Sequence, residues 1–147
     1  MKDLLSVKGL TTHIFTDHGV VKAVNDVSLR VAARESVALV GESGCGKSMT
    51  ALSLMRLAQK PARILGGEVM FNGNDILNLA EKDMRKIRGG DLAIIFQDPL
   101  TFLNPLRPAG QQIVEAIRLH RNVGGKEAHE IAMDALRLGK VPDPARV

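Results

Sequence analysis

A glycine-rich segment at residues 41–48 constrains the fold of this chain more than any other feature. Its sequence, GESGCGKS, fits the pattern G-x-x-x-x-G-K-[ST]. The short apolar run at 36–40 that precedes it has the composition of a buried strand, and the segment at 49–57 that follows it has apolar residues at helical spacing. The pattern therefore lies in a turn between an expected strand and an expected helix, which is the context that this motif requires.

The residue types in this segment suit a chain of phosphates. Glycines let the backbone turn successive N–H groups inward as an anion nest, and the helix that follows directs its positive end to the same place. Lys47 can reach the outer phosphates as a mobile charge, and the Ser48 hydroxyl can be a ligand of Mg2+. The segment predicts a site for a chain of phosphates with Mg2+; the alternative is an ordinary turn with a solvated lysine. The predicted contacts come from Gly41, Glu42, Ser43, Gly44, Cys45, Gly46, Lys47, Ser48 and Met49.

Composition and charge exclude several other classes of protein. No segment contains the ~20 apolar residues that cross a bilayer, and the N-terminus lacks the apolar stretch of a signal peptide. The net charge of +4 comes without a basic run interleaved with aromatic residues, so no nucleic acid is predicted as a partner. The single cysteine excludes an internal disulfide and fits a reducing compartment. We therefore expect a cytoplasmic protein that reaches a membrane only through a partner.

The other elements follow from apolar periodicity and turn residues. Strands are expected at 4–14, 20–31, 68–71 and 92–96, the first two antiparallel and the last a central parallel strand. A turn is expected at the Gly66-Gly67 pair. Helices are expected near 81–87 and on both sides of a break at 122–125, after a proline-rich loop at 97–105.

In this order, the parts resemble the ATP-binding cassette (ABC) family, specifically the ATPase subunits of bacterial oligopeptide and dipeptide importers. The resemblance covers nearly the whole chain and is carried by residues 19–28, 40–48 and 94–105. The third stretch, IIFQDPLTFLNP, is the most specific, because many unrelated NTPases share the glycine-rich loop. The resemblance implies an α/β fold: a P-loop NTPase core with a parallel sheet, an N-terminal antiparallel β-subdomain and the start of a helical subdomain. Residues 1–107 would form the nucleotide-binding core, and residues 108–147 would begin the helical subdomain.

The resemblance also implies roles for residues outside the glycine-rich segment. Gln97 takes the position of the glutamine that reaches Mg2+ and the attacking water, so Lys47 and Gln97 would act in catalysis. Phe15 takes the position of an aromatic residue that stacks on adenine, with His13 and His18 as alternatives and a core role for Phe15 also open. Met49 stands where a hydroxyl residue is commoner, but its N–H can still bind a phosphate.

Three parts of the family pattern do not occur in this sequence: the LSGGQ-type signature, the Walker B strand with its catalytic glutamate, and the switch histidine. His120 and His129 lie on expected helices at unsuitable positions. The resemblance is therefore to the N-terminal part of such an ATPase, ending before the signature. We expect this chain alone to hydrolyse ATP weakly or not at all, because it lacks groups that position the attacking water.

The parent protein implied by the resemblance is an ATP-binding subunit that couples ATP binding and hydrolysis to the import of peptides or a related small solute. Its partners would be a second ATPase subunit in a homo- or heterodimer, integral membrane permease subunits and, indirectly, a periplasmic solute-binding protein. It would lie at the cytoplasmic face of the bacterial inner membrane as a peripheral protein. Two alternatives stay open: a non-enzymatic ATP-binding fragment and a non-transport P-loop ATPase.

Overall fold

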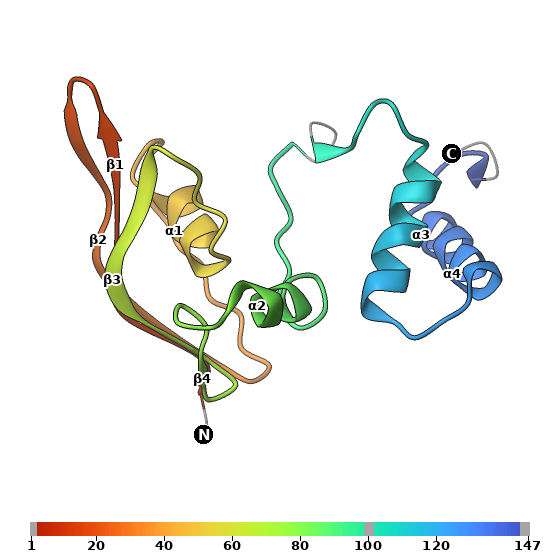
Figure 1. The fold of residues 1–147 in the computed structure, drawn as a ribbon, viewed down its shortest axis with the longest axis horizontal. Helices are drawn as coiled ribbons and strands as arrows, with labels where there is room; N and C mark the ends of the chain where they lie inside the picture. Colours follow the sequence, from red (N-terminus) through yellow and green to blue (C-terminus); the bar gives the residue numbers. More distant parts are fainter. Residues whose placement is uncertain (1–2, 99–101, 145–147) are drawn as a thin grey trace. The chain divides into compact units, whose positions relative to one another are not determined.

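The chain forms two compact units in a computed structural model that describes residues 3–98 and 102–144 (Figure 1). The first unit extends to Arg85 and the second begins at Lys86. We describe each unit by itself, and the functional boundary expected after residue 107 stays a prediction. Three residues of the stretch 94–105, namely Pro99, Leu100 and Thr101, lie outside the described residues.

An antiparallel sheet is the framework of the first unit. Its strands are β1 (Asp3–Thr16), β2 (Gly19–Ala32), β3 (Ala62–Phe71) and β4 (Asn74–Asp75), in the spatial order β2-β1-β3-β4. The central strand β1 pairs with both neighbours, so that Val7 lies opposite Leu29 on one side and Val69 on the other. The expected antiparallel pair near the N-terminus is therefore confirmed.

The turn predicted at Gly66-Gly67 is wrong, because β3 runs through both glycines. Gly67 has a φ of +110°, and a Cβ built on it would lie 2.6 Å from the Cα of Leu10 in the neighbouring strand. A glycine is needed there because two backbones approach closely. Glycine is also typical of turns, and for that reason the sequence predicted a turn at this pair.

Helix α1 (Lys47–Leu54) packs beside the sheet (Figure 1). A buried pair of hydroxyls joins the two: the Oγ1 of Thr12 on β1 lies 2.8 Å from the Oγ of Ser53 on α1. Ser53 donates its own proton to the Met49 carbonyl at 2.7 Å, so Thr12 is the donor in the pair. The buried apolar residues of the sheet include Val7, Leu10 and Val69.

Helix α2 (Glu81–Ile87) confirms the helix expected near 81–87, and the boundary between the two units falls within it. The guanidinium of Arg56, just after α1, donates to the Leu79 carbonyl at 2.6 Å and lies 3.7 Å from the Glu81 carboxylate. These contacts attach the start of α2 to the end of α1.

Two further helices, α3 (Ala109–His120) and α4 (Gly125–Leu138), make up most of the second unit and confirm the expected amphipathic pair. Helix α4 buries Ala128, Ala132 and Leu136, which recur every fourth residue along one face. At the end of α3, His120 packs over a glycine turn: a Cβ built on Gly89 would lie 2.6 Å from the His120 ring.

Two apolar runs form no sheet among the described residues: 36–40, which was expected to be a buried strand, and 92–96, which was expected to be a central parallel strand. Residues 36–40 have no regular secondary structure, and the run at 92–96 contains only a single parallel bridge between Arg88 and Leu92. Val40 is 89% exposed and Ile95 is 92% exposed. The expectation was wrong for these segments because a parallel strand requires neighbours that are distant in the sequence, whatever its own apolar content.

Candidate nucleotide-binding site

The glycine-rich segment forms a tight loop whose backbone only glycine adopts easily. Gly44 and Gly46 have φ values of +82° and +94°, in the left-handed region. Gly46 is also the residue that begins α1, and a Cβ on it would overlap the carbonyl oxygen of Ala23 in β2. The loop is therefore seated directly against the sheet, and the identity of Gly46 is set by that contact as well as by its φ.

Lys47 folds back over this loop. Its Nζ donates to the carbonyl oxygens of Gly41 at 2.8 Å and Glu42 at 2.6 Å, and it lies 3.4 Å from the Sγ of Cys45. Carbonyl oxygens carry only partial negative charge, so these contacts orient the ammonium group without neutralising it. The lysine thus closes the loop and keeps a full positive charge at its mouth.

The start of α1 adds further positive potential at the same place. The first turn carries no acidic residue, and no side chain caps the helix N-terminus. The N–H groups of a first helical turn have no partner within the helix, so they are available to an anion. Ser48 is exposed in this turn, while Thr50 bonds its hydroxyl to the Gly46 carbonyl at 2.9 Å. The loop, the lysine and the helix terminus therefore converge on one surface of positive potential.

The predicted phosphate-contacting residues 41–49 lie in the glycine loop and the first turn of α1. Gln97 lies in the second unit, exposed in a segment without regular secondary structure. It follows Phe96, whose ring stacks on that of Phe102 with centroids 3.8 Å apart. The roles assigned to Gln97 in catalysis, and to Gln97 and Ser48 as ligands of Mg2+, stay predictions.

Phe15 lies near the end of β1 and is 37% exposed, so its ring is not a core residue of the sheet. The guanidinium carbon of Arg63, on β3, lies over this ring at 5.2 Å from its centroid. No sequence pattern indicated a role for Arg63, because the pairing of β1 with β3 that brings it to Phe15 joins segments far apart in the chain. The base-stacking role of Phe15 stays a prediction.

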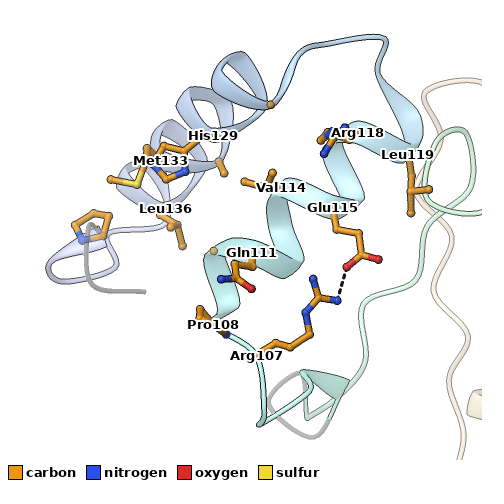
Figure 2. Close-up of a pocket in the computed structure, with 14 residues that line it drawn as sticks. Arg107, Pro108, Gln111, Val114, Glu115, Arg118, Leu119, His129, Met133 and Leu136 are labelled. Atoms are coloured by element: carbon orange, nitrogen blue, oxygen red, sulfur yellow. Dashed lines mark hydrogen bonds and ion pairs between the residues drawn. The ribbon is translucent and has the colours of Figure 1, made fainter.

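A cavity of about 880 Å³ lies between α3 and α4 in the second unit (Figure 2). The side chains that line it include Val114, Met133 and Leu136. Arg107 and Glu115 also line it and form an ion pair of 2.6 Å. None of the predicted nucleotide contacts lines this cavity. Since phosphate binding needs the amides and the lysine of the loop, we place the candidate site at the loop.

No three metal-binding side chains cluster in residues 3–98 and 102–144. Within the same ranges, no helix has the length and apolar character needed to cross a bilayer.

A glycine loop that places its lysine at a helix N-terminus is the pattern of the P-loop nucleotide-binding proteins. Residues 24–143 match the ABC transporter family, and the chain belongs to that family. It is 46% identical over 97% of its length to the "Probable peptide ABC transporter ATP-binding protein" of Sinorhizobium fredii. It is 44% identical over 95% of its length to the oligopeptide transport ATP-binding protein OppD of Escherichia coli. The chain spans 43% and 41% of these two relatives, less than half of each.

Solved structures agree on the fold. The chain superposes on a dimeric bacterial ABC transporter cassette with a TM-score of 0.80 at 23% identity, covering 95% of this chain and 58% of that one. A dimeric ATP-binding cassette bound to ADP and Pi gives a TM-score of 0.78 at 21% identity, with the same coverage. The predicted α/β fold of the ABC type is thereby confirmed, with the N-terminal part of that domain present in this chain.

Proposed function

We propose that this chain is the nucleotide-binding part of the ATPase subunit of a peptide importer. The observation that carries the proposal is the Lys47 ammonium, held by two carbonyl oxygens at the mouth of a glycine loop and next to an uncapped helix N-terminus. Relatives named for peptide and oligopeptide transport support the choice of importer and of solute class.

In the proposed site, each group has a separate task. The backbone N–H groups from Gly44 onward cradle the phosphates, and Lys47 neutralises charge on the outer ones. The Ser48 hydroxyl would hold Mg2+, which when bound supplies charge neutralisation at the phosphate oxygens. Gln97 would contact the same metal and the attacking water, and so report the state of the nucleotide to the membrane subunit.

The partners in this proposal are a second ATPase subunit and integral membrane permease subunits, with a periplasmic solute-binding protein acting indirectly. The dimeric state of the neighbouring cassettes supports the first of these. The protein would then be peripheral, at the cytoplasmic face of the inner membrane. Co-purification with an integral membrane subunit would separate this proposal from a non-transport ATPase.

A second candidate is a non-enzymatic ATP-binding fragment, which is favoured by the absence of the signature, Walker B and switch-histidine stretches from this sequence. The 147-residue chain should bind Mg-ATP but turn it over weakly or not at all. A phosphate-release assay on the purified chain tests this. Turnover of several ATP per second by a monomer would contradict it.

The proposed binding of phosphates by Lys47 is tested by replacing Lys47 with alanine. The variant should bind Mg-ATP at least about tenfold more weakly, because a hydrogen bond to a charged group is lost at the triphosphate. Isothermal titration calorimetry of the purified protein measures the effect. Lys82→Ala is the matched control, since it removes an exposed lysine from α2 and lowers the net charge equally. Unchanged affinity in a folded Lys47→Ala protein would overturn the proposal.

The single cysteine offers a second test. The Cys45 thiol is exposed, and a Cβ on Gly41 would lie 2.5 Å from its Sγ, so a bulky adduct on that sulfur would crowd the loop. Alkylation with N-ethylmaleimide should block nucleotide binding, and Mg-ATP should protect the thiol. Mass spectrometry and calorimetry on the same sample decide the matter: complete modification with unchanged ATP affinity would contradict the proposed use of the loop.

A further inference from the structure

We propose that Arg63 is a positioning residue of the nucleotide site, which holds the Phe15 ring by a cation–π contact so that the ring can stack on the base. This inference rests on the proposed function. It adds a residue to which no sequence pattern assigns a role, and it explains how an exposed aromatic side chain can be oriented before the nucleotide arrives.

The sheet register brings the two side chains together. Arg63 on β3 lies directly opposite His13 on β1, and Phe15 is two residues beyond His13. Side chains two apart on a strand share a face, so Phe15 and Arg63 are diagonal neighbours, within reach of a long side chain. The guanidinium carbon is 5.2 Å from the ring centroid, which is within the range of a cation–π contact.

The backbone of Phe15 is fixed on both sides, and only its ring needs positioning. Its N–H donates to the Pro61 carbonyl at 3.2 Å, and on the other side Phe15 pairs with Val20 of β2. The turn that follows is closed by the Thr16 hydroxyl, which donates to the Gly19 carbonyl at 2.8 Å. With the main chain held in this way, the contact with Arg63 selects the orientation of the ring.

The distance along the sheet suits a nucleotide. The phosphate loop meets β2 at Ala23, where Gly46 touches the carbonyl oxygen, and Phe15 lies opposite Val20 on the same strand. Three residues of a strand span about 10 Å, which is of the order of the length of a nucleotide. A base attached to phosphates in the loop could therefore reach the Phe15 ring.

The histidines near Phe15 fit this position less well. The Nε2 of His13 is buried and has no hydrogen-bond partner among the described residues, so it cannot receive the edge of a base from solvent. His18 lies in the turn between β1 and β2 rather than on the face that Phe15 and Arg63 share. Phe15 with Arg63 is the pair that is exposed and already oriented.

The test compares ATP with inorganic triphosphate, both titrated calorimetrically with Mg2+ into the purified protein. Phe15→Ala should weaken ATP binding by about five- to 150-fold, and Arg63→Ala by about two- to fivefold. Triphosphate binding should stay unchanged in both variants, because neither residue contacts the phosphates. Arg63→Lys should recover part of the loss, since an ammonium also makes a cation–π contact.

A double variant separates positioning from direct contact. If Arg63 acts through the ring, Phe15→Ala with Arg63→Ala should bind ATP no more weakly than Phe15→Ala alone. Lys8→Ala is the control for net charge, because Lys8 pairs with Glu68 elsewhere on the same sheet.

Several results would overturn the inference. They are an unchanged ATP affinity in Arg63→Ala, an equal loss for ATP and triphosphate, and an effect of Arg63→Ala that persists without Phe15. These outcomes would leave the proposed binding of phosphates by the loop and Lys47 unaffected. Wild-type protein that binds neither ligand, or Lys47→Ala that binds both normally, would instead overturn the proposed function on which the inference rests.

Discussion

The antiparallel sheet and the two apolar runs at 36–40 and 92–96 have similar side chains but differ in burial and in strand pairing. In the sheet, Val7, Leu10 and Val69 are buried and every long strand is paired. In the runs, Val40 and Ile95 are almost fully exposed, and the described residues contribute one isolated bridge. Apolar, β-branched composition is therefore insufficient to make a strand.

The difference lies in where the partners come from. Strand β2 follows β1 after a two-residue turn, so the pair closes with a small loss of chain entropy. A parallel strand instead needs neighbours brought back by long crossover connections. An exposed apolar run is a surface that another segment can cover.

The largest expected effect lies in the sheet core. Leu10→Ala should destabilise the protein by about 2–5 kcal/mol, because it leaves a cavity at a fully buried position. Urea denaturation followed by circular dichroism measures the loss. Leu65→Ala on β3 is the control, because that side chain is half exposed. Equal effects of the two substitutions would show that the sheet has no specific core.

The next largest effect is expected where the phosphate loop meets the sheet. Gly46→Ala should cost about 1–3 kcal/mol more than Gly73→Ala. Both glycines have a positive φ, but only Gly46 has a backbone carbonyl in the space of the new Cβ. Thermal unfolding of the two variants isolates the clash from the strain that they share. If the two variants have the same melting temperature, the loop does not pack against β2 as described.

A smaller effect is expected from the buried link between β1 and α1. Thr12→Val should cost about 1 kcal/mol, because the Ser53 oxygen loses its donor in a buried site. Thr16→Val also removes a hydrogen bond, but an exposed one, and should change the free energy of unfolding by less. Chemical denaturation of both variants gives the difference. A larger loss for Thr16→Val would contradict the role assigned to the buried pair.

The smallest effect is expected in the apolar runs. Val40→Thr should change the stability of the 147-residue chain by no more than about 0.5 kcal/mol, since an exposed side chain has little burial to lose. It should also reduce self-association, which size-exclusion chromatography with light scattering measures. A loss above about 1 kcal/mol would mean that the run is packed, and would remove the contrast with the sheet.

Sequence reasoning succeeded where the signal is contiguous. The phosphate loop, the first two strands and the pair of helices α3 and α4 each have their pattern within a single short segment. It failed at Gly67, because a close approach of two strands and a turn both favour glycine. It also failed at the runs 36–40 and 92–96, because no local pattern shows whether a strand has partners.

The sequence by itself determined the chemistry of the loop, because eight consecutive residues supply the glycines, the lysine and the hydroxyl. Only the tertiary structure decided that Gly46 rests on β2, that Lys47 is held by two carbonyl oxygens, and that Arg63 lies over Phe15. The physical reason is distance along the chain. Arg63 and Phe15 are 48 positions apart, and only the register of β1 with β3 makes them neighbours.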